Sequence, residues 1–223
     1  MAYVDAGPSD GQVALLQHGE PSWSFLYRHV VWVLTENGIR CVAPDMVGFG
    51  RSDKPLHQAD YSYTQLVEWT RERVFDHLDL REVTLVGQDW GGLIGLRLLA
   101  EHPDRFNRVV AANTGLPTGD FDMPEVCAKA GVRAMPGLVP TRPDDPASEA
   151  NRAAWEALAA SDLPFLLAFS DSDLITGAMA PILRKLLPGT RALSQPTIRN
   201  AGHFLQEDAG DDLGRVVVDF MSR

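Results

Sequence analysis

Residues 83–95 constrain this chain more than any other stretch. Residues 83–86 (VTLV) are apolar or β-branched, which predicts a short buried strand, and residues 93–100 have the pattern of a helix. The turn between them is bounded by glycines, because a side chain at those positions would clash in so sharp a reversal. Such a turn lifts the side chain of Asp89 clear of the sheet and points it at the helix N-terminus, where free N–H groups favour negative charge.

Strand, Gly-x-nucleophile-x-Gly turn and helix together make the nucleophile elbow of α/β-hydrolases. The usual nucleophile there is Ser, so Asp89 disfavours a serine esterase. A carboxylate suits displacement of a leaving group at a saturated carbon, which leaves an alkyl ester on the enzyme. Water must then cleave that ester with the help of a base and an oxyanion hole. The alternative interpretation is a glycine-rich turn in which Asp89 only caps the helix.

The rest of the chain alternates strands with helices. Strands are predicted at 2–4, 13–16, 39–43, 83–86, 109–113, 164–169 and 192–198, and helices at 25–35, 63–78, 93–100, 149–160, 178–187 and 211–221. This rhythm is typical of an α/β-hydrolase fold, a mostly parallel sheet with helices on both faces, in which ligands bind at the carboxyl ends of the strands. Only the proline-dense residues 115–160 break the rhythm. We therefore expect residues 1–114 and 161–223 to form the core and residues 115–160 to form an insertion.

Three residues supply a nucleophile, an acid and a histidine in the chain order of α/β-hydrolases. Asp89, Asp173 and His203 each follow a predicted strand, so their side chains can converge at one edge of the sheet. His203 would be the general base that takes a proton from water, and Asp173 would hold its tautomer. Asp171 competes for the acid role, but Asp173 directly precedes the apolar Leu174-Ile175 and is expected to point inward. The alternative is that all three are ordinary loop and turn residues.

An oxyanion hole is predicted from two backbone N–H groups. His18-Gly19-Glu20-Pro21 follows an earlier strand, where the second donor of such a site arises, so Glu20 and Trp90 are the expected donors. The indole N–H of Trp90 is a donor without an acceptor function, and beside the nucleophile it could solvate a departing halide. The alternatives are an ordinary loop charge for the Glu20 side chain and a packing aromatic for Trp90.

Composition narrows the class of protein. The chain has 223 residues, with 20 basic against 30 acidic side chains and a net charge of −10, which argues against nucleic acid and anionic membranes as partners. No apolar run reaches membrane-spanning length, and the first residues have no secretory signal pattern. Cys41 and Cys127 make no disulfide framework. These features favour a single-domain cytoplasmic α/β protein.

Five segments resemble the haloalkane dehalogenases, most closely the subgroup with HGEP-type loops and an Asp acid after a late strand. They are HGEPSWSFLYR (18–28), PDMVGFGRSDKP (44–55), VGQDWGG (86–92), FSDSDLITG (169–177) and AGHFLQED (201–208), and the resemblance covers nearly the whole chain. It implies that Asp89 is the alkylated nucleophile, Asp173 the acid, His203 the base and Trp90 one halide donor. The implied reaction converts a 1-haloalkane to an alcohol, a halide ion and a proton, with no cofactor or metal.

Two departures from that family bear on activity. By this resemblance we expect the first of two N-terminal edge strands to be missing, and the 115–160 insertion resembles only the later part of the family's helical cap. The missing part is where the subgroup holds its second halide-binding Trp, and Trp155 does not match that position. A cap excludes water and desolvates the carboxylate, so we expect an open site, slower halide release and an exposed apolar floor that favours self-association.

Two further interpretations remain. An epoxide hydrolase also uses an Asp nucleophile with an Asp–His pair, but it needs acid donors, usually cap tyrosines, and the four tyrosines (3, 27, 61 and 63) all lie outside the insertion. A low-activity or non-catalytic scaffold would fit the reduced cap, although a drifting remnant should have lost a member of the Asp89, Asp173 and His203 set.

Overall fold

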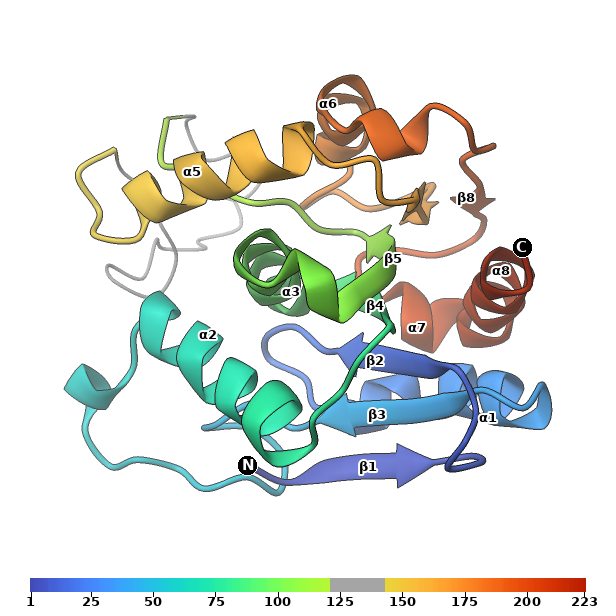
Figure 1. Ribbon diagram of the computed structural model, residues 1–223, viewed down its shortest axis with the longest axis horizontal. Coiled ribbons are helices and arrows are strands. Elements are labelled where there is room, and N and C mark those ends of the chain that lie inside the picture. Colours follow the sequence, from blue (N-terminus) through green and yellow to red (C-terminus); the bar gives the residue numbers. More distant parts are fainter. Residues whose placement is uncertain (121–142) are drawn as a thin grey trace.

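The computed structural model describes residues 1–120 and 143–223, and its centre is a six-stranded sheet with the order β1-β3-β2-β4-β5-β6 (Figure 1). The strands are β1 Tyr3–Ala6, β2 Val13–Gln17, β3 Arg40–Pro44, β4 Val83–Gln88, β5 Phe106–Ala112 and β6 Phe165–Leu167. Only β1 is antiparallel to its neighbour, and the other pairs are parallel. The predicted α/β-hydrolase fold with a mostly parallel sheet is therefore confirmed.

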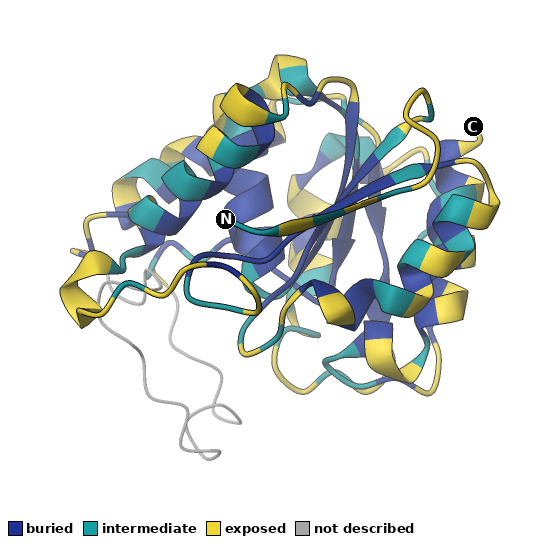
Figure 2. Ribbon diagram, turned by 90° about the horizontal axis from the view of Figure 1, so that it is seen from below, coloured by how far each residue is buried: buried dark blue, intermediate teal, exposed yellow. Residues whose placement is uncertain are grey.

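Helices cover both faces of the sheet because the strands are apolar on both sides. The helices are α1 Arg28–Glu36, α2 Tyr63–Arg71, α3 Trp90–Glu101, α5 Ser148–Ala159, α6 Met179–Leu186, α7 Leu205–Asp208 and α8 Gly210–Met221. Leu15 packs in the core below α2, α3 and α5, whereas the next residue, Leu16, packs in the core below α1, α7 and α8. Figure 2 shows the buried strands between the two helix layers, with the exposed edge formed by β1.

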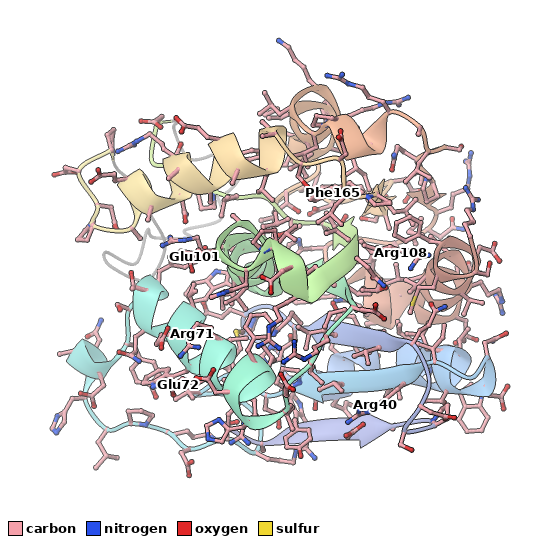
Figure 3. The ribbon with its side chains drawn as sticks, in the orientation of Figure 1. Arg40, Arg71, Glu72, Glu101, Arg108 and Phe165 are labelled. Carbon is pink, nitrogen blue, oxygen red and sulfur yellow. The ribbon has the colours of Figure 1, made fainter. Side chains whose placement is uncertain are left out.

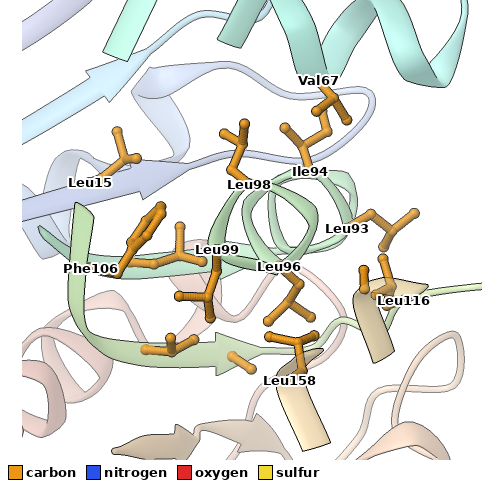
Figure 4. Packing of buried hydrophobic residues seen from close by; sticks show 14 of the residues in the cluster. Leu15, Val67, Leu93, Ile94, Leu96, Leu98, Leu99, Phe106, Leu116 and Leu158 are labelled. Atoms are coloured by element: carbon orange, nitrogen blue, oxygen red, sulfur yellow. The ribbon is translucent and has the colours of Figure 1, made fainter. Parts of the chain in front are cut away.

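Helix α3, which follows the elbow, is buried on almost every side (Figure 4). Its residues 93–99 are all buried, including Gly95, whose missing side chain leaves room for Leu85 of the strand beneath it. Leu96 and Leu158 belong to the same core cluster, which joins α3 to α5. Contacts with α2, α5 and strand β4 hold α3 in place, and this positions the turn at its N-terminus.

Several predicted elements differ from the structure. The strand expected at 192–198 is only β8, Thr197–Ile198, because the side-chain oxygen of Gln195 accepts the Leu167 N–H at 2.6 Å in place of a backbone carbonyl. The strand expected at 164–169 is split into β6 and β7, Phe169–Ser170, although Ala168 N–H still bonds to the Ala111 carbonyl. The helix expected at 63–78 is α2 followed by the π-helical turn Glu72–His77.

Part of the predicted insertion packs with the core. In α5, Ala154 and Leu158 join the core cluster below α3, and Trp155 donates its indole N–H to the Leu116 carbonyl at 2.8 Å. The division into a core and a 115–160 insertion stays a prediction. Its residues 121–142 lie outside the described residues, and with them Cys127 and three of the prolines (124, 136 and 140).

Charged side chains lie at the exposed edge of the sheet. Arg40 of β3, labelled in Figure 3, forms a two-pronged salt bridge with Asp5 of β1, with the closer contact at 2.7 Å. A charged edge resists pairing with strands of other molecules. Among the described helices none is both long and apolar enough to span a membrane.

Candidate active site

Asp89 occupies a strained turn at the carboxyl end of β4. Its φ is +51° and its ψ −126°, a conformation that L residues rarely adopt. The turn is tight because Gly91 and Gly92 leave room that a side chain would fill: a Cβ on Gly91 would meet the Gln17 carbonyl, and one on Gly92 would meet Thr114. The Asp89 N–H bonds to the Asn113 carbonyl at 3.0 Å, and its carbonyl accepts from the Thr114 hydroxyl at 2.7 Å. Four hydrogen-bonding and steric constraints thus hold the strained residue.

The three predicted triad residues come together at the carboxyl edge of the sheet. His203 Nε2 lies 3.3 Å from Asp89 Oδ2, and His203 Nδ1 lies 3.0 Å from Asp173 Oδ1. The side chain of Asp173 is completely buried, whereas the side chains of His203 and Asp89 are 10% and 14% exposed. The side chains come from the turn after β4, the loop after β7 and the loop after β8. A carboxylate, an imidazole and a second carboxylate in a row can transfer one proton and hold the resulting charge.

Asp173, rather than Asp171, faces His203. Its second oxygen accepts from the Thr176 N–H at 3.1 Å and from the Thr176 hydroxyl, so the carboxylate is fixed on both sides. Asp171 instead accepts the N–H groups of Asn200 and Ala201, as a turn residue does. From sequence, Asp173 is preferred because it precedes the apolar Leu174, and this reason is wrong. Leu174 is 72% exposed, so burial of Leu174 does not orient Asp173.

The electrostatics of the site favour a charged imidazole while Asp89 is ionised. Burial alone would lower the pKa of His203, but its contacts with Asp173 and Asp89 outweigh burial and raise that pKa to about 9. Burial works against ionisation of Asp173 as well, yet the bonds from His203 and Thr176 lower its pKa. Once one of its two carboxylate neighbours loses its charge, the imidazole can give up its proton near neutral pH and is then able to accept one from water.

The backbone N–H of Glu20 reaches the nucleophile directly. It donates to Asp89 Oδ1 at 3.0 Å, and Gly19 allows this approach because a Cβ there would overlap the Asp89 side chain. Buried His18 fixes the loop: its Nδ1 lies 2.9 Å from the Gly19 carbonyl and its Nε2 accepts the Met46 N–H at 3.0 Å. Burial lowers the pKa of His18, which keeps the ring neutral and able to accept. Glu20 is partly buried, and burial together with the Asp89 charge raises the pKa of its side chain.

Trp90 is the first residue of α3 and follows the nucleophile. Its ring is partly buried against the core, and within residues 1–120 and 143–223 its indole N–H has no hydrogen-bond partner. That donor is therefore free for a ligand. Trp155 differs because its indole N–H already donates to a backbone carbonyl. This bond agrees with the expectation that Trp155 is not a halide donor.

Two buried amides were missed by the sequence reasoning. Asn113 follows β5 with a φ of +40°, and its side chain bonds to Ser170 and to the carbonyls of Gly202 and His203. Gln88 directly precedes Asp89 and contacts His203 twice. The available signal was a polar residue at the carboxyl end of each of two apolar strands, where a parallel sheet gathers its ligands.

No group of three His, Cys, Asp or Glu residues in the described ranges is placed to hold a metal ion. Two shallow surface grooves lie away from the triad. One of about 170 Å³ runs between α3 and α5 beside Arg97 and Glu101, and one of about 380 Å³ lies at the start of α8 beside His29 and Asp211.

The fold and the carboxylate elbow define the class of this protein. The chain matches the α/β hydrolase fold family over residues 13–161. It is 45% identical to a haloalkane dehalogenase of Psychrobacter cryohalolentis, over 98% of this chain and 86% of that relative. It is 43% identical to a haloalkane dehalogenase of Mycolicibacterium paratuberculosis, over 99% of this chain and 87% of that one. The chain therefore belongs to the haloalkane dehalogenase family.

A solved structure agrees with this family. The tetrameric haloalkane dehalogenase DpaA from Paraglaciecola agarilytica superposes with a TM-score of 0.81 at 29% identity, over 96% of this chain and 85% of that one. The alignment with the Psychrobacter relative runs for 262 positions, more than the 223 residues of this chain, so the relative carries residues that this chain lacks. The expected shortening of the N-terminus and of the 115–160 insertion stays a prediction.

Proposed function

We propose that this protein hydrolyses small apolar 1-haloalkanes to an alcohol, a halide ion and a proton, through a covalent ester on Asp89. The observation that carries the proposal is a largely buried carboxylate nucleophile 3.3 Å from a histidine that is itself bonded to a second carboxylate. The named relatives are haloalkane dehalogenases, which supports the same reaction class.

In the first step, a carboxylate oxygen of Asp89 displaces the halide from carbon. Oδ1 is held by the Glu20 N–H, so Oδ2 is the oxygen better able to attack. The C–X bond breaks, the halide leaves with the bonding electrons, and a C–O bond forms. We assign the solvation of the leaving halide to the free indole N–H of Trp90, since an N–H donor stabilises charge that develops in the transition state.

In the second step, His203 Nε2 takes a proton from water, and the hydroxide attacks the carbonyl carbon of the ester. Negative charge develops on Oδ1, which the backbone N–H of Glu20 already contacts at 3.0 Å. The backbone N–H of Trp90 is the second expected donor. Collapse releases the alcohol and restores the Asp89 carboxylate, and His203 passes the proton to solvent. Asp173 stabilises the imidazolium and holds its tautomer through Nδ1. No cofactor or metal takes part in this scheme.

An epoxide hydrolase lacks support from the described tyrosines. Tyr27, Tyr61 and Tyr63 donate their hydroxyls to the backbone carbonyls of Gln17, Pro55 and Leu93. The fourth, Tyr3, lies on the edge strand β1. None of them is free to protonate an epoxide oxygen beside Asp89.

The decisive experiment is bromide release from 1,2-dibromoethane in parallel with isotope labelling. A single turnover in H₂¹⁸O should label the Asp89 carboxylate, because water attacks the ester carbonyl and not the substrate carbon. His203→Gln should accumulate protein carrying a bromoethyl group, and Asp89→Asn should carry none. Label found only in the alcohol after one turnover would mean that Asp89 acts as a general base, and no bromide release from folded protein would refute the reaction.

Trp90 can be tested separately. Trp90→Phe keeps an aromatic ring but removes the indole N–H, and loss of one such donor costs about a hundred- to a thousandfold in kcat. The loss should be greater for chloride than for bromide, because chloride is the poorer leaving group and depends more on a hydrogen-bond donor. Equal losses for both would contradict the assignment.

We also propose that copies of this chain associate through an apolar surface near the acid loop. It comprises Leu174 (72% exposed), Ile175 (44%), Ile182 (37%) and Leu186 (43%). The tetrameric state of the Paraglaciecola relative makes self-association a property worth testing here. Light scattering should report an oligomer that Leu174→Ser with Ile182→Ser dissociates, while Leu56→Ser, also an exposed leucine, leaves it intact. A monomeric parent would refute this surface as an interface.

A further inference from the structure

The proton-accepting nitrogen of His203 has two neighbours. Asp89 Oδ2 lies 3.3 Å from Nε2, and the amide nitrogen of Gln88 lies 3.2 Å from the same atom. Gln88 is fully buried and directly precedes the nucleophile in the chain. The reaction proposed above uses Asp89 and leaves Gln88 without a role.

The Gln88 amide is locked with its nitrogen toward His203. That nitrogen also donates to the His203 carbonyl at 3.1 Å, and a carbonyl can only accept, so a flipped amide would set two oxygens against each other. On the far side, Nε2 of the buried Gln206 donates to Gln88 Oε1 at 3.3 Å. The His203 carbonyl therefore opposes a flip, and the Gln206 contact is compatible with the unflipped amide.

We propose that Gln88 is a positioning residue that donates a hydrogen bond to the unprotonated Nε2 of His203 in the alkylated enzyme and thereby keeps the base neutral. This inference rests on the proposed dehalogenase reaction. A donor that bonds to the neutral form of a group disfavours its charged form. Gln88 thus opposes the imidazolium, whereas both carboxylates favour it.

The balance between these groups changes during the reaction. In the free enzyme the Asp89 carboxylate faces Nε2 and Asp173 faces Nδ1, in line with the raised pKa of His203. Alkylation converts Asp89 to a neutral ester, so the charge at Nε2 disappears while the Gln88 donor stays. His203 then releases its proton before it must take one from water. The other charged groups nearby are Glu20, which senses the Asp89 charge, and Asp208, which accepts the Gly202 N–H at 2.8 Å.

The hydrogen bond can be tested without turnover. Asp89→Asn carries an uncharged side chain of the same shape as the nucleophile and mimics the loss of charge in the ester. In this background, an NMR titration of the His203 imidazole should show a higher pKa after Gln88→Met, by about one unit or tenfold in proton affinity, and a larger rise after Gln88→Glu. Gln17→Met is the matched control, because Gln17 is equally buried and its side-chain nitrogen and oxygen have no partner.

A kinetic measurement covers the alkylated enzyme itself. In otherwise unchanged protein, Gln88→Met should move the acid limb of ester hydrolysis to higher pH by a similar amount and spare the alkylation burst above that limb. An unmoved titration and a rate loss that is the same at every pH would overturn the proposal and leave Gln88 with a packing role. Because the titration needs no substrate, it is independent of whether the chain dehalogenates.

Discussion

Asn113 Nδ2 donates to the carbonyl oxygen of His203 at 3.1 Å, and the carbonyl of the same Asn113 accepts the N–H of Asp89. One buried residue at the end of β5 therefore bonds to the loop of the base and to the turn of the nucleophile. Through Ser170 it also reaches the strand that precedes Asp173. The three candidate catalytic loops share a single polar anchor.

Removing this anchor should loosen the triad. Asn113→Gly keeps the positive φ without strain but loses the side-chain bonds, so we expect kcat to fall about a hundredfold, since misplacement by about 1 Å costs that much. Asn151→Ala is the control: it removes an equally buried amide, bonded to Arg97 and Pro117, far from the triad. Both variants should lose about 1–3 kcal/mol in urea unfolding. Equal kcat values for the two would contradict the role of Asn113.

Replacing Gly19 should disconnect the oxyanion donor. In Gly19→Ala the added methyl would overlap Asp89 and push the Glu20 N–H out of its 3.0 Å contact, and kcat should fall by about two to three orders of magnitude. Gly38→Ala also carries a backbone penalty, because φ is +73°, but nothing lies within 4 Å of its methyl. This control should lose about 1 kcal/mol of stability and keep its rate. Steady-state kinetics beside thermal melts separate the two effects.

Stability should fall as the pH rises toward 9. The pKa of His203 is about 9 in the folded chain and about 6.5 when unfolded, so its ion pairs contribute fully below about pH 6.5 and are lost as the pH passes 9. Each unit between the two pKa values is worth about 1.4 kcal/mol. Urea unfolding across this range should show the decline. Asp89→Asn, which removes one of the carboxylates that raise the pKa, should flatten the decline, and an unchanged slope would contradict the assignment.

The buried carboxylate of Asp45 should contribute to acid stability. Asp45 is fully buried, and although burial opposes its ionisation, bonds from Arg51 and Ser24 lower its pKa to about 2. Its contribution is therefore present above the unfolded pKa of about 3.9 and is lost as the pH falls toward 2. Asp45→Ala should cost about 1–3 kcal/mol at neutral pH, because the N–H groups of Ser24 and Arg51 lose their buried acceptor while the half-exposed Arg51 side chain stays solvated. Asp212→Ala breaks the exposed pair with Arg215 and should cost less than about 1 kcal/mol.

Local sequence patterns predicted the fold and the triad for a physical reason. Apolar strands followed by polar residues fix where a parallel sheet gathers its side chains, and Asp89, Asp173 and His203 all follow such strands. Position in the chain could not predict bonds between distant amides, so Asn113 and Gln88 were missed. The strand expected at 192–198 failed because a side chain, Gln195, satisfies a backbone N–H that the pattern assigned to a neighbouring strand.

The absence of a side chain on Gly19 has a consequence for which residues the sequence can carry here. The Glu20 contact with Asp89 comes from the backbone, so it does not depend on the residue type at position 20, whereas position 19 must carry no side chain at all. A library randomised at both positions and selected for halide release should return one amino acid at 19 and many at 20. The strictest sequence requirement in this loop is therefore the absence of a Cβ atom at position 19.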